Sequence, residues 1–496
     1  MEFKPTKEQL DFFNEVKNGF GNILIQAYAG CSKTTSAIES LKFIPEDKSK
    51  IFLAFNKHIK DELKLKLPEG VKTNTLHSIG YGSILRKYKD VQFDEFKIDK
   101  IINKKKSKWN VDQEFNFDTE KINEYLKTIK KLVDLCRLTL TTKKQYVPYL
   151  CDRYNIKYNS NTDIKRVFMV LEEAFNDKHT IDYTDMIFMP AVDNKIFLIQ
   201  YDYVYVDEIQ DLNKAQQIMV DKMVKRDRKT GQKTGRLILI GDFFQSIYGF
   251  TGVTEKTFDW YYSIPNTKKL TLSTTFRCAK NIVKHAQKYT PELKAMDNAI
   301  DGVVREGSVI NEAENGDFVL CRTTMPLVKL FFHFLLKEKK AIIRGSEIGL
   351  SLIDMTTDVE NIDNLKQIWK EKLNTYKLSL LANGVINPEE DSDYASLEDK
   401  VLTLLFIARL SKNIEDLRLK IQSIFSDEIE GIILSTVHKA KGLEADRVFI
   451  VRPDLLPMTK NIRSQWEKQQ EINLTYVAIT RARKELVYDN KWTDED

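Results

Sequence analysis

The feature that most constrains this chain is a short apolar run that enters a loop of small residues and ends in Lys33 and Thr34. The apolar run, Asn22–Tyr28, is typical of a buried strand, and a helical pattern starts at Lys33. This order predicts a phosphate-binding loop, because backbone N–H groups at a helix N-terminus can close around phosphate oxygens. In such a loop Lys33 would neutralise the β- and γ-phosphates, and the Thr34 hydroxyl would ligate Mg²⁺.

Short apolar runs alternate with helical patterns along the rest of the chain, which predicts an α/β fold with parallel sheets. The further strand candidates are residues 50–55, 203–206, 236–240, 317–321, 431–434 and 447–451. Two polar segments, 84–179 and 347–428, have helical spacing and few strand signals. We interpret both segments as helical insertions into α/β domains.

Charge gives only weak support for nucleic-acid binding. The net charge is +5, from 77 basic and 72 acidic residues, and binding depends on local patches rather than on such a small excess. One basic patch stands out, and it is either a solvated helix face or a DNA contact. Its members are Lys97, Lys100, Lys104, Lys105, Lys106 and Lys108.

Other features of the composition indicate a reducing, intracellular compartment. No stretch approaches the ~18 consecutive apolar residues of a membrane span, and the N-terminus lacks the apolar segment of a secretory signal. The five cysteines contain no C-x-x-C pair, so neither a zinc knuckle, nor an iron–sulfur cluster, nor a disulfide framework is expected. We expect a cytoplasmic protein of a bacterial or phage-infected cell, without a membrane partner.

A second motif is the acidic pair Asp207 and Glu208, which follows a hydrophobic strand. Such a pair can supply a carboxylate to the Mg²⁺ site (Asp207) and a general base near the attacking water (Glu208). The alternative is an acidic strand end at the surface. Because the phosphate-binding loop lies upstream, the catalytic interpretation is favoured.

A third motif follows the strand candidate 236–240. Gln245 is placed to sense the γ-phosphate or the attacking water. Tyr248 and Phe250 are two residues apart in a predicted loop, where they either pack in the core or stack on bases. The residues alone leave both possibilities open.

The order of these motifs resembles superfamily 1 DNA helicases of the UvrD/Rep/PcrA type. The runs Phe55–Lys57 and Thr75–Ser78 are most similar to the F-box DNA helicase branch, and the matches extend from Gln9 to Arg483. The resemblance implies two RecA-like, parallel-sheet P-loop domains, each with a mainly helical insertion. The implied ranges are 1–83 and 180–265 for the first core domain, 84–179 for its insertion, 266–346 and 429–496 for the second core domain, and 347–428 for a reduced insertion.

The resemblance also implies roles in binding and hydrolysing ATP. Gln9 would read the adenine edge, Phe276 would stack on adenine, and Glu444 would lie near the ribose. Arg277 and Arg481 would be arginine fingers that stabilise charge on the transferring phosphoryl group. The implied catalytic residues are Lys33, Glu208, Gln245, Arg277 and Arg481, and those for Mg²⁺ are Thr34 and Asp207. The implied ATP-binding set is Gln9, Ala27, Tyr28, Ala29, Gly30, Cys31, Ser32, Lys33, Thr34, Thr35, Phe276, Arg277, Glu444 and Arg481.

For DNA, the resemblance implies a single-strand groove with five contact residues. These are Phe55, His77, Tyr248, Phe250 and His438. Base–aromatic stacking contributes roughly 1–3 kcal/mol per base whatever the sequence, as a motor on DNA requires. With the resemblance, stacking is the favoured role of Tyr248 and Phe250.

The implied activity is ATP-dependent movement along single-stranded DNA, 3′→5′, with unwinding of tailed duplexes and with ATP between the two core domains. Two alternatives remain: a translocase that strips proteins and unwinds poorly, and a regulatory DNA-binding protein with a decayed P-loop. The second arises because Ser32 and Ala27 stand where the family has glycine. Thr251 also stands where the family often has arginine, and the second insertion is short.

Overall fold

The structure is a computed structural model of the chain. It describes residues 4–154, 156–158, 160–249, 252–253, 255–357, 359–382, 385, 387–427, 430–458 and 464–492. Packing divides the chain into two units. The first comprises Met1–Ala27 and Ser32–Leu272, and the second comprises Tyr28–Cys31 and Ser273–Asp496.

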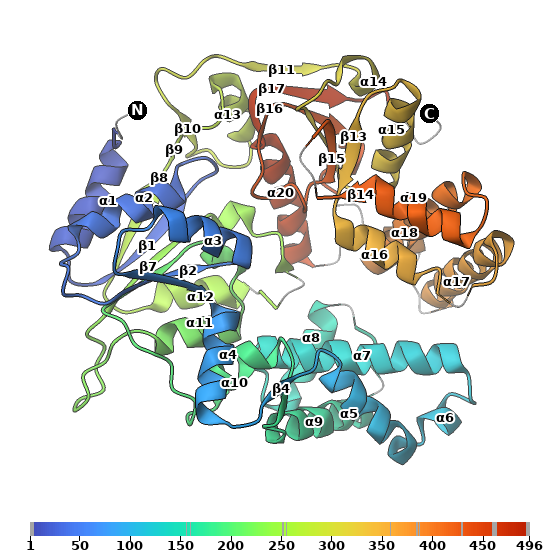
Figure 1. Cartoon of the computed structure of the whole chain (residues 1–496), viewed down its shortest axis with the longest axis horizontal. Helices are drawn as coiled ribbons and strands as arrows, with labels where there is room; N and C mark the ends of the chain where they lie inside the picture. The colour runs from blue at the N-terminus through green and yellow to red at the C-terminus, as the bar shows by residue number, and fades with distance from the viewer. Residues whose placement is uncertain are drawn as a thin grey trace. The chain divides into compact units, whose positions relative to one another are not determined.

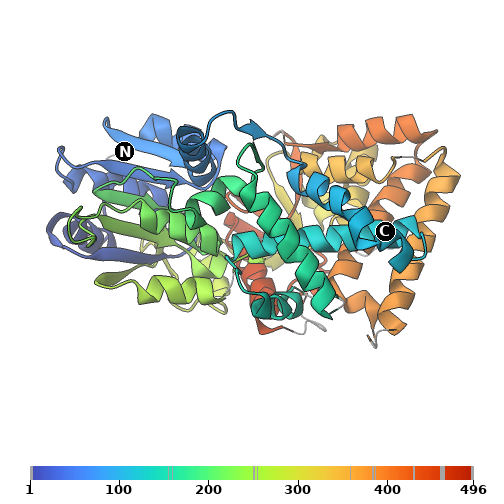
Figure 2. The ribbon, with the colours of Figure 1, turned by 90° about the horizontal axis from the view of Figure 1, so that it is seen from below.

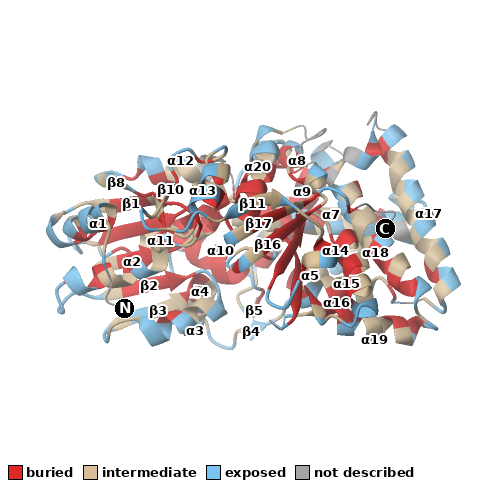
Figure 3. Cartoon of the chain, turned by 90° about the horizontal axis from the view of Figure 1, so that it is seen from above, coloured by how far each residue is buried: buried red, intermediate tan, exposed pale blue. Residues whose placement is uncertain are grey.

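The first unit is built on a six-stranded parallel sheet (Figure 1). In spatial order its strands are β3 (Val71–Thr75), β2 (Lys50–Ala54), β6 (Tyr203–Val206), β7 (Arg236–Gly241), β1 (Asn22–Ala27) and β8 (Thr267–Leu272). The central strand β7 is buried along its whole length, as expected for a continuous apolar run covered on both faces. Figure 3 shows buried residues concentrated in these strands.

Helices flank this sheet and bury apolar faces against it. They are α1 (Lys7–Asn18), α2 (Lys33–Ser40), α3 (Lys57–Lys66), α4 (Leu76–Lys87), α10 (Asp185–Val192), α11 (Lys214–Lys222) and α12 (Glu255–Ser263). Helix α1 begins with a capping box, in which Thr6 and Gln9 each accept the other's backbone N–H. Its buried face includes Phe12 and Val16.

The first helical insertion has a hydrophobic core of its own. Its helices are α5 (Lys97–Lys106), α6 (Val111–Glu114), α7 (Thr119–Leu138), α8 (Val147–Arg153) and α9 (Ser160–Asn176). Figure 2 shows these helices, cyan to green, packed as a bundle. A small parallel pair, β4 (Gln92–Phe93) and β5 (Thr180–Ile181), joins the two ends of the insertion.

The second unit contains a seven-stranded parallel sheet. Its spatial order is β11 (Val303–Glu306), β17 (Ala482–Asp489), β16 (Ala445–Val451), β12 (Phe318–Cys321), β15 (Ile432–Thr436), β13 (Ala341–Arg344) and β14 (Phe425–Ser426). A separate parallel pair is formed by β9 (Thr274–Thr275) and β10 (Lys294–Ala295). The accompanying helices are α13 (Lys280–Ala286), α14 (Val309–Glu312), α15 (Met325–Leu336) and α20 (Gln465–Ile479).

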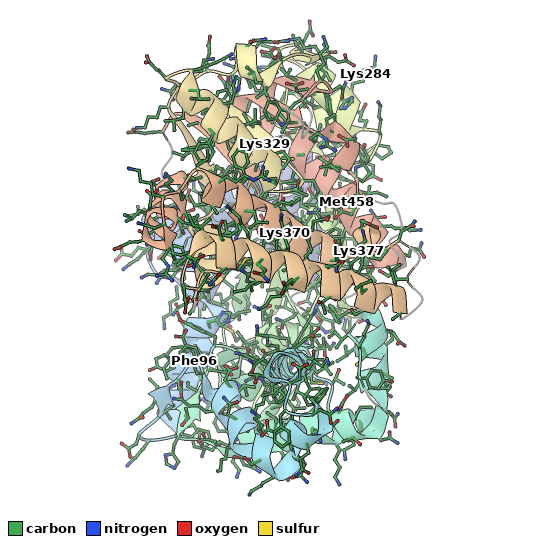
Figure 4. The ribbon with its side chains drawn as sticks, turned by 90° about the vertical axis from the view of Figure 1, so that its right-hand side faces the viewer. Phe96, Lys284, Lys329, Lys370, Lys377 and Met458 are labelled. Carbon is green, nitrogen blue, oxygen red and sulfur yellow. The ribbon has the colours of Figure 1, made fainter. Side chains whose placement is uncertain are left out.

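The second helical insertion shares its core with the sheet that carries it. Its helices are α16 (Ser346–Asp354), α17 (Ile362–Ala382), α18 (Ser392–Arg409) and α19 (Ile414–Ile424). Leu365 of α17 and Leu417 of α19 belong to the same apolar cluster as Val319 of β12. Lys370 and Lys377 lie two turns apart on α17 (Figure 4), and Lys377 pairs with Glu389 at 2.5 Å.

These elements confirm the expected fold class: parallel α/β sheets with mainly helical insertions. Strand β8 pairs with β1, so the first sheet extends to Leu272, beyond the expected boundary at residue 265. The five cysteines are all free and buried. Among the described residues, no helix is both long enough and apolar enough to span a membrane.

Candidate active site and nucleic-acid interface

Most of the predicted residues of this unit directly follow five neighbouring strands of the first sheet, in a loop or in the first turn of the next helix. The carboxyl ends of parallel strands meet at one edge of a sheet, which is where α/β proteins bind ligands. The segment after β3 carries His77, and the segment after the neighbouring β2 carries Phe55. The segment after β6 carries Asp207 and Glu208. The segment after β7 carries Gln245, and the segment after β1 carries Lys33 and Thr34. The DNA candidates Phe55 and His77 therefore lie on one side of this edge and Lys33 with Thr34 on the other, while the DNA candidate Tyr248 follows β7 together with Gln245.

The two predicted Mg²⁺ residues are in direct contact. The Thr34 hydroxyl donates a hydrogen bond to Asp207 Oδ2 at 2.7 Å. Burial, followed by the charge of Glu208, raises the pKa of Asp207 to about 6, although Lys33 opposes the shift. A buried carboxylate beside a second carboxylate is stabilised by a cation, so this pair fits a Mg²⁺ ion ligated through hydroxyl and carboxylate oxygens.

Glu208, the predicted base, has an unusual backbone. Its φ of 53° and ψ of 43° are left-handed, which is strained for a residue with a side chain. The Glu208 carboxylate accepts a short hydrogen bond from Gln210 Nε2 and lies 3.9 Å from Lys33 Nζ. The residues predicted as base and as phosphate-binding lysine thus lie close together.

A buried network connects Glu208 to the loop after β7. Gln210 Oε1 accepts the N–H of Asp242 at 3.0 Å, and the Asp242 carboxylate accepts hydrogen bonds from Gln245 Nε2 at 2.7 Å and Gln26 Nε2 at 3.0 Å. A Cβ at Gly241 would lie 2.4 Å from Gln210 Oε1, so this close approach requires glycine. The predicted sensor Gln245 is therefore held in place by a carboxylate that also faces Lys33.

Sequence reasoning missed three members of this network: Gln26, Gln210 and Asp242. Gln210 and Asp242 lie within quoted motifs, but no local pattern shows which polar side chains become buried partners. Gln26 is a polar residue inside strand β1, whose other interior residues are apolar. That exception is the one local signal that could have identified it, because a polar group in a sheet needs a partner.

Ser32 stands directly before Lys33 and has a left-handed backbone, with φ of 55° and ψ of 41°. The position therefore has a positive φ, a backbone conformation that glycine adopts without strain and serine does not. The helix start is nevertheless intact, because both the N–H and the hydroxyl of Ser36 bond to the Ser32 carbonyl at 2.8 Å.

Three other residues predicted to bind the nucleotide, Gln9, Thr35 and Ala27, differ in their surroundings. The Gln9 side chain is buried and bonds to Thr6 N through Oε1 and to the Ser36 hydroxyl through Nε2. Thr35 is exposed in the first turn of α2, and Ala27 is the buried last residue of β1. The adenine-reading role of Gln9 stays a prediction.

The loop tip, Tyr28–Cys31, groups with the second unit. The Tyr28 hydroxyl donates to Glu292 at 2.6 Å, the Ala29 N–H donates to the Tyr476 hydroxyl at 2.9 Å, and the Gly30 carbonyl accepts the Phe276 N–H at 2.9 Å. Cys31 is buried.

In the second unit, three predicted residues from distant parts of the sequence lie together. Glu444 and Arg481 directly precede β16 and β17, which pair from Ala445 and Ala482 onward. Arg277 forms an ion pair with Glu444, and its Nη1 donates to the Thr480 carbonyl at 3.2 Å. Phe276, beside Arg277, is 43% exposed and so available for stacking.

Arg481 itself is buried. It donates hydrogen bonds to the carbonyl oxygens of Val477 and Leu443, each at 3.0 Å. Burial, and then the charge of Arg277, lowers the pKa of Arg481 to about 9. Two guanidinium groups held near each other would both be stabilised by an added anion.

The predicted DNA residues are distributed over both units. Phe55 and His77 line one small hollow together with Asp207 in the first unit, and Phe55 is 40% exposed. Tyr248 is half-buried in its loop. Phe250 and Thr251 lie outside the described residues.

His438, the remaining predicted DNA residue, follows β15 in the second unit. Burial, and then the charges of Arg322 and Lys441, lowers its pKa to about 3, so the imidazole is neutral at physiological pH. A neutral ring can stack on a base without adding charge.

The predicted basic patch of the first insertion is mostly neutralised. Lys97 is buried against Asp185 at 2.6 Å. The neighbouring lysines pair as Lys100 with Asp94, Lys104 and Lys105 with Glu173, and Lys106 with Asp112. These pairs favour the solvated-face interpretation over a DNA contact.

Comparison with known proteins gives two family-model matches. Residues 13–262 match the UvrD/REP helicase N-terminal domain, and residues 431–487 match the UvrD-like helicase C-terminal domain. Similar proteins include F-box DNA helicase protein 1 of Schizosaccharomyces pombe (25% identical, 95% of this chain, 56% of the relative) and F-box DNA helicase 1 of Gallus gallus (25%, 98% and 49%). A probable DNA helicase II homolog of Mycoplasma genitalium is 23% identical, over 94% of this chain and 82% of the relative.

The chain spans about half the length of the two F-box helicases. The N-terminal match covers the first sheet up to α12, and the C-terminal match covers β15, β16 and most of β17. Both matched segments contain residues of the site described above.

Proposed function

We propose, from the premise that this chain belongs to the UvrD/REP helicase family, that it is an ATP-dependent DNA helicase. In this proposal ATP hydrolysis is coupled to movement along single-stranded DNA and to separation of a duplex. The observation that carries it is the row of loops at the carboxyl edge of the first sheet, where Lys33, the Thr34–Asp207 pair and Glu208 lie together.

These residues divide the chemistry of hydrolysis among themselves. Lys33 holds the β- and γ-phosphates, while Thr34 and Asp207 would hold Mg²⁺, which supplies charge neutralisation at those phosphates. Glu208 accepts the proton of the attacking water as general base, and Gln210 orients its carboxylate. Gln245, fixed by Asp242, reports on the γ-phosphate or the water.

The proposed roles of the second unit concern charge and adenine binding. Arg277 and Arg481 contribute positive charge to the transferring phosphoryl group, and Phe276 stacks on adenine. For this, Arg481 must exchange the carbonyl oxygens of Val477 and Leu443 for phosphate oxygens. Burial, and then the charge of Arg277, lowers the pKa of Arg481, so an added phosphate would stabilise its charge.

The proposed DNA residues are Phe55, His77, Tyr248, Phe250 and His438. Phe55, His77 and Asp207 line one hollow, which supports a link between bound DNA and hydrolysis. The proposed polarity is 3′→5′, and the proposed location is the cytoplasm. A translocase with weak unwinding would have the same site. Only an unwinding assay therefore distinguishes a helicase from such a translocase.

The test combines two substitutions with tailed duplexes. We expect Glu208→Gln to bind ATP but to lose DNA-stimulated turnover by about 10²–10⁴-fold, the usual contribution of a general base. Lys33→Ala should lose productive phosphate binding instead. Stopped-flow unwinding should require a 3′ tail in the wild-type protein.

The possible contrary results identify different errors. Wild-type turnover in Glu208→Gln would refute the base assignment. Unwinding from 5′ tails alone would reverse the polarity. Rapid DNA-stimulated hydrolysis without strand separation would favour the translocase, and a wild-type protein without ATP hydrolysis would favour the decayed P-loop.

A further inference from the structure

The first unit contains a pocket of about 600 Å³ that none of the roles above uses. Helix α3, strand β3 and helix α4 form its walls, and Ile51, Ile79, Tyr201 and Met223 add an apolar side. Its volume lies within the range of ~300–1,000 Å³ that is usual for ligand sites. We refer to it as the basic pocket.

Four cationic side chains line the basic pocket: Lys60 and Lys64 from α3, Lys72 from β3 and Arg86 from α4. None of the residues described along its wall is acidic. Lys60 contacts Asp61 at 3.4 Å, whereas the structure, in its described ranges, gives Lys64, Lys72 and Arg86 no carboxylate partner. Such a concentration of like charge favours an anionic ligand.

Polar groups of the same wall add hydrogen-bonding capacity. Thr73, Asn74 and Ser78 line the pocket beside the cations. The hydroxyl of Thr73 is buried, and within the described part of the chain it has no hydrogen-bond partner. An unsatisfied buried hydroxyl is destabilising, and a ligand oxygen would satisfy it.

The extent of the wall favours a polyanion over a single phosphate. Ser78 and Arg86 are eight residues apart on α4, which corresponds to about 12 Å along the helix. A nucleic-acid strand carries one phosphate per ~3.4 Å in a duplex, so this length matches several phosphates. The wall also continues directly from His77, because Ser78 is the next residue.

We propose that the basic pocket binds the sugar–phosphate backbone of the DNA strand beyond Phe55 and His77, and so lengthens the footprint of the protein on that strand. The proposal rests on the proposed function only in taking DNA as the ligand. Binding is independent of base sequence, because lysine and arginine contact phosphates.

The test is the double substitution Lys64→Ala/Arg86→Ala, with DNA binding measured without ATP. Both side chains are exposed, so the variant is expected to fold. We expect weaker binding to long oligodeoxythymidylates and a log–log salt dependence that is less steep by about 1.4, or 0.7 for each lost phosphate contact. Short oligonucleotides, which end before the pocket, should bind as they do to the wild-type protein.

The matched control is Lys66→Ala/Lys87→Ala. It removes the same charge from the same two helices, but neither residue lines the pocket, and Lys66 pairs with Glu62 at 2.5 Å. We expect its salt dependence to equal that of the wild-type protein. The charge-conserving variant Lys64→Arg/Arg86→Lys should also retain binding.

Three results would overturn the proposal. The first is an equal loss in the control variant, which would indicate a general charge effect. The second is an unchanged salt dependence in the pocket variant. The third is calorimetric binding of inorganic pyrophosphate that the pocket variant loses while it binds DNA normally, which would indicate a small-anion site. Failure of the proposed function can be distinguished from failure of this proposal. The first would appear as a lack of DNA-stimulated ATP hydrolysis, whereas the salt dependence of DNA binding tests whether the basic pocket contacts phosphates.

Discussion

At the residue scale, the proposed active site contains two residues with side chains in left-handed backbone conformations. Ser32 precedes the phosphate-binding lysine, and Glu208 is the proposed base. A left-handed conformation costs an L-residue roughly 1–2 kcal/mol, so both positions persist against local preference. Strain of this kind tends to concentrate at functional sites.

The first prediction concerns Ser32. Because its side chain makes no capping hydrogen bond, Ser32→Gly should remove strain at little cost and raise the free energy of unfolding by about 1 kcal/mol. Nucleotide affinity should also increase. Thr35→Gly, at a helical and exposed position of α2, is the control and should destabilise the protein instead. Denaturant titration and nucleotide titration measure the two effects, and a destabilised Ser32→Gly would contradict the strain argument.

A second prediction assigns Gln210 a positioning role. Gln210→Leu removes the donor to Glu208 and the acceptor for the Asp242 N–H, so kcat for ATP should fall about tenfold or more while KM changes little. The control is Gln217→Leu, another fully buried glutamine of the first unit. If both variants lose stability but only Gln210→Leu loses kcat, the role is positional. Equal kcat values would show that Gln210 is merely structural.

At the element scale, strand prediction succeeded where apolar runs were continuous. Strands β1, β2, β6, β7, β12, β15 and β16 all lie at the expected runs, because strands buried on both faces are apolar throughout. In the two large sheets, β3, β8, β11, β13, β14 and β17 were missed. The interior strands β13 and β17 have short or charge-interrupted apolar runs, whereas β3, β8, β11 and β14 are edge strands. Edge sequences such as Thr267–Leu272, with its two lysines, are polar because edge strands face solvent.

The site residues likewise divide into those whose positions the sequence predicts and those whose positions it does not. Lys33, Thr34, Asp207 and Glu208 follow strands that the sequence predicts, so their convergence could be expected from sheet geometry alone. The partnership of Gln26 with Asp242 could not, since it joins residues 216 positions apart. Burial of Arg481 depends likewise on the carbonyl of Leu443, which only the folded second unit supplies.

A third prediction concerns the attachment of the first insertion. Lys97 of α5 is buried and bonds to Asp185 of α10 at 2.6 Å and to the Ala174 carbonyl at 2.8 Å. Lys97→Met should destabilise the first unit by about 3 kcal/mol, because it leaves buried acceptors without their partner.

The matched control for Lys97→Met is Lys100→Met on the same helix. Lys100 pairs with Asp94 at the same distance of 2.6 Å, but its side chain is 70% exposed. Its loss should therefore cost less than about 1 kcal/mol. Thermal unfolding of the two variants provides the comparison. Equal shifts of the melting temperature would show that burial does not distinguish the pairs.

At the scale of the whole molecule, the two units have separate cores, so their unfolding need not be a single transition. Cysteines are distributed over both. Cys136 and Cys151 lie in the core of the first insertion, and Cys278 and Cys321 are buried in the second unit.

The fourth prediction follows from these thiols. Burial raises the pKa of Cys136 and Cys151 to about 12 and that of Cys278 and Cys321 to about 11, so the native protein should react slowly with thiol reagents at neutral pH. In increasing denaturant, labelling followed by mass spectrometry should modify each pair at its own midpoint. Simultaneous labelling of all four would indicate one cooperative transition.

The order of loops along the first sheet has a mechanical consequence. Neighbouring strands are only ~4.8 Å apart, and β2, which leads to Phe55, adjoins β6, which leads to Asp207. If the proposed roles hold, ATP hydrolysis and DNA contact are separated by a single interstrand spacing, a distance that needs no chain of intermediate residues between them. Mutations that uncouple ATP hydrolysis from movement along DNA should accordingly cluster in the segments that follow these two strands.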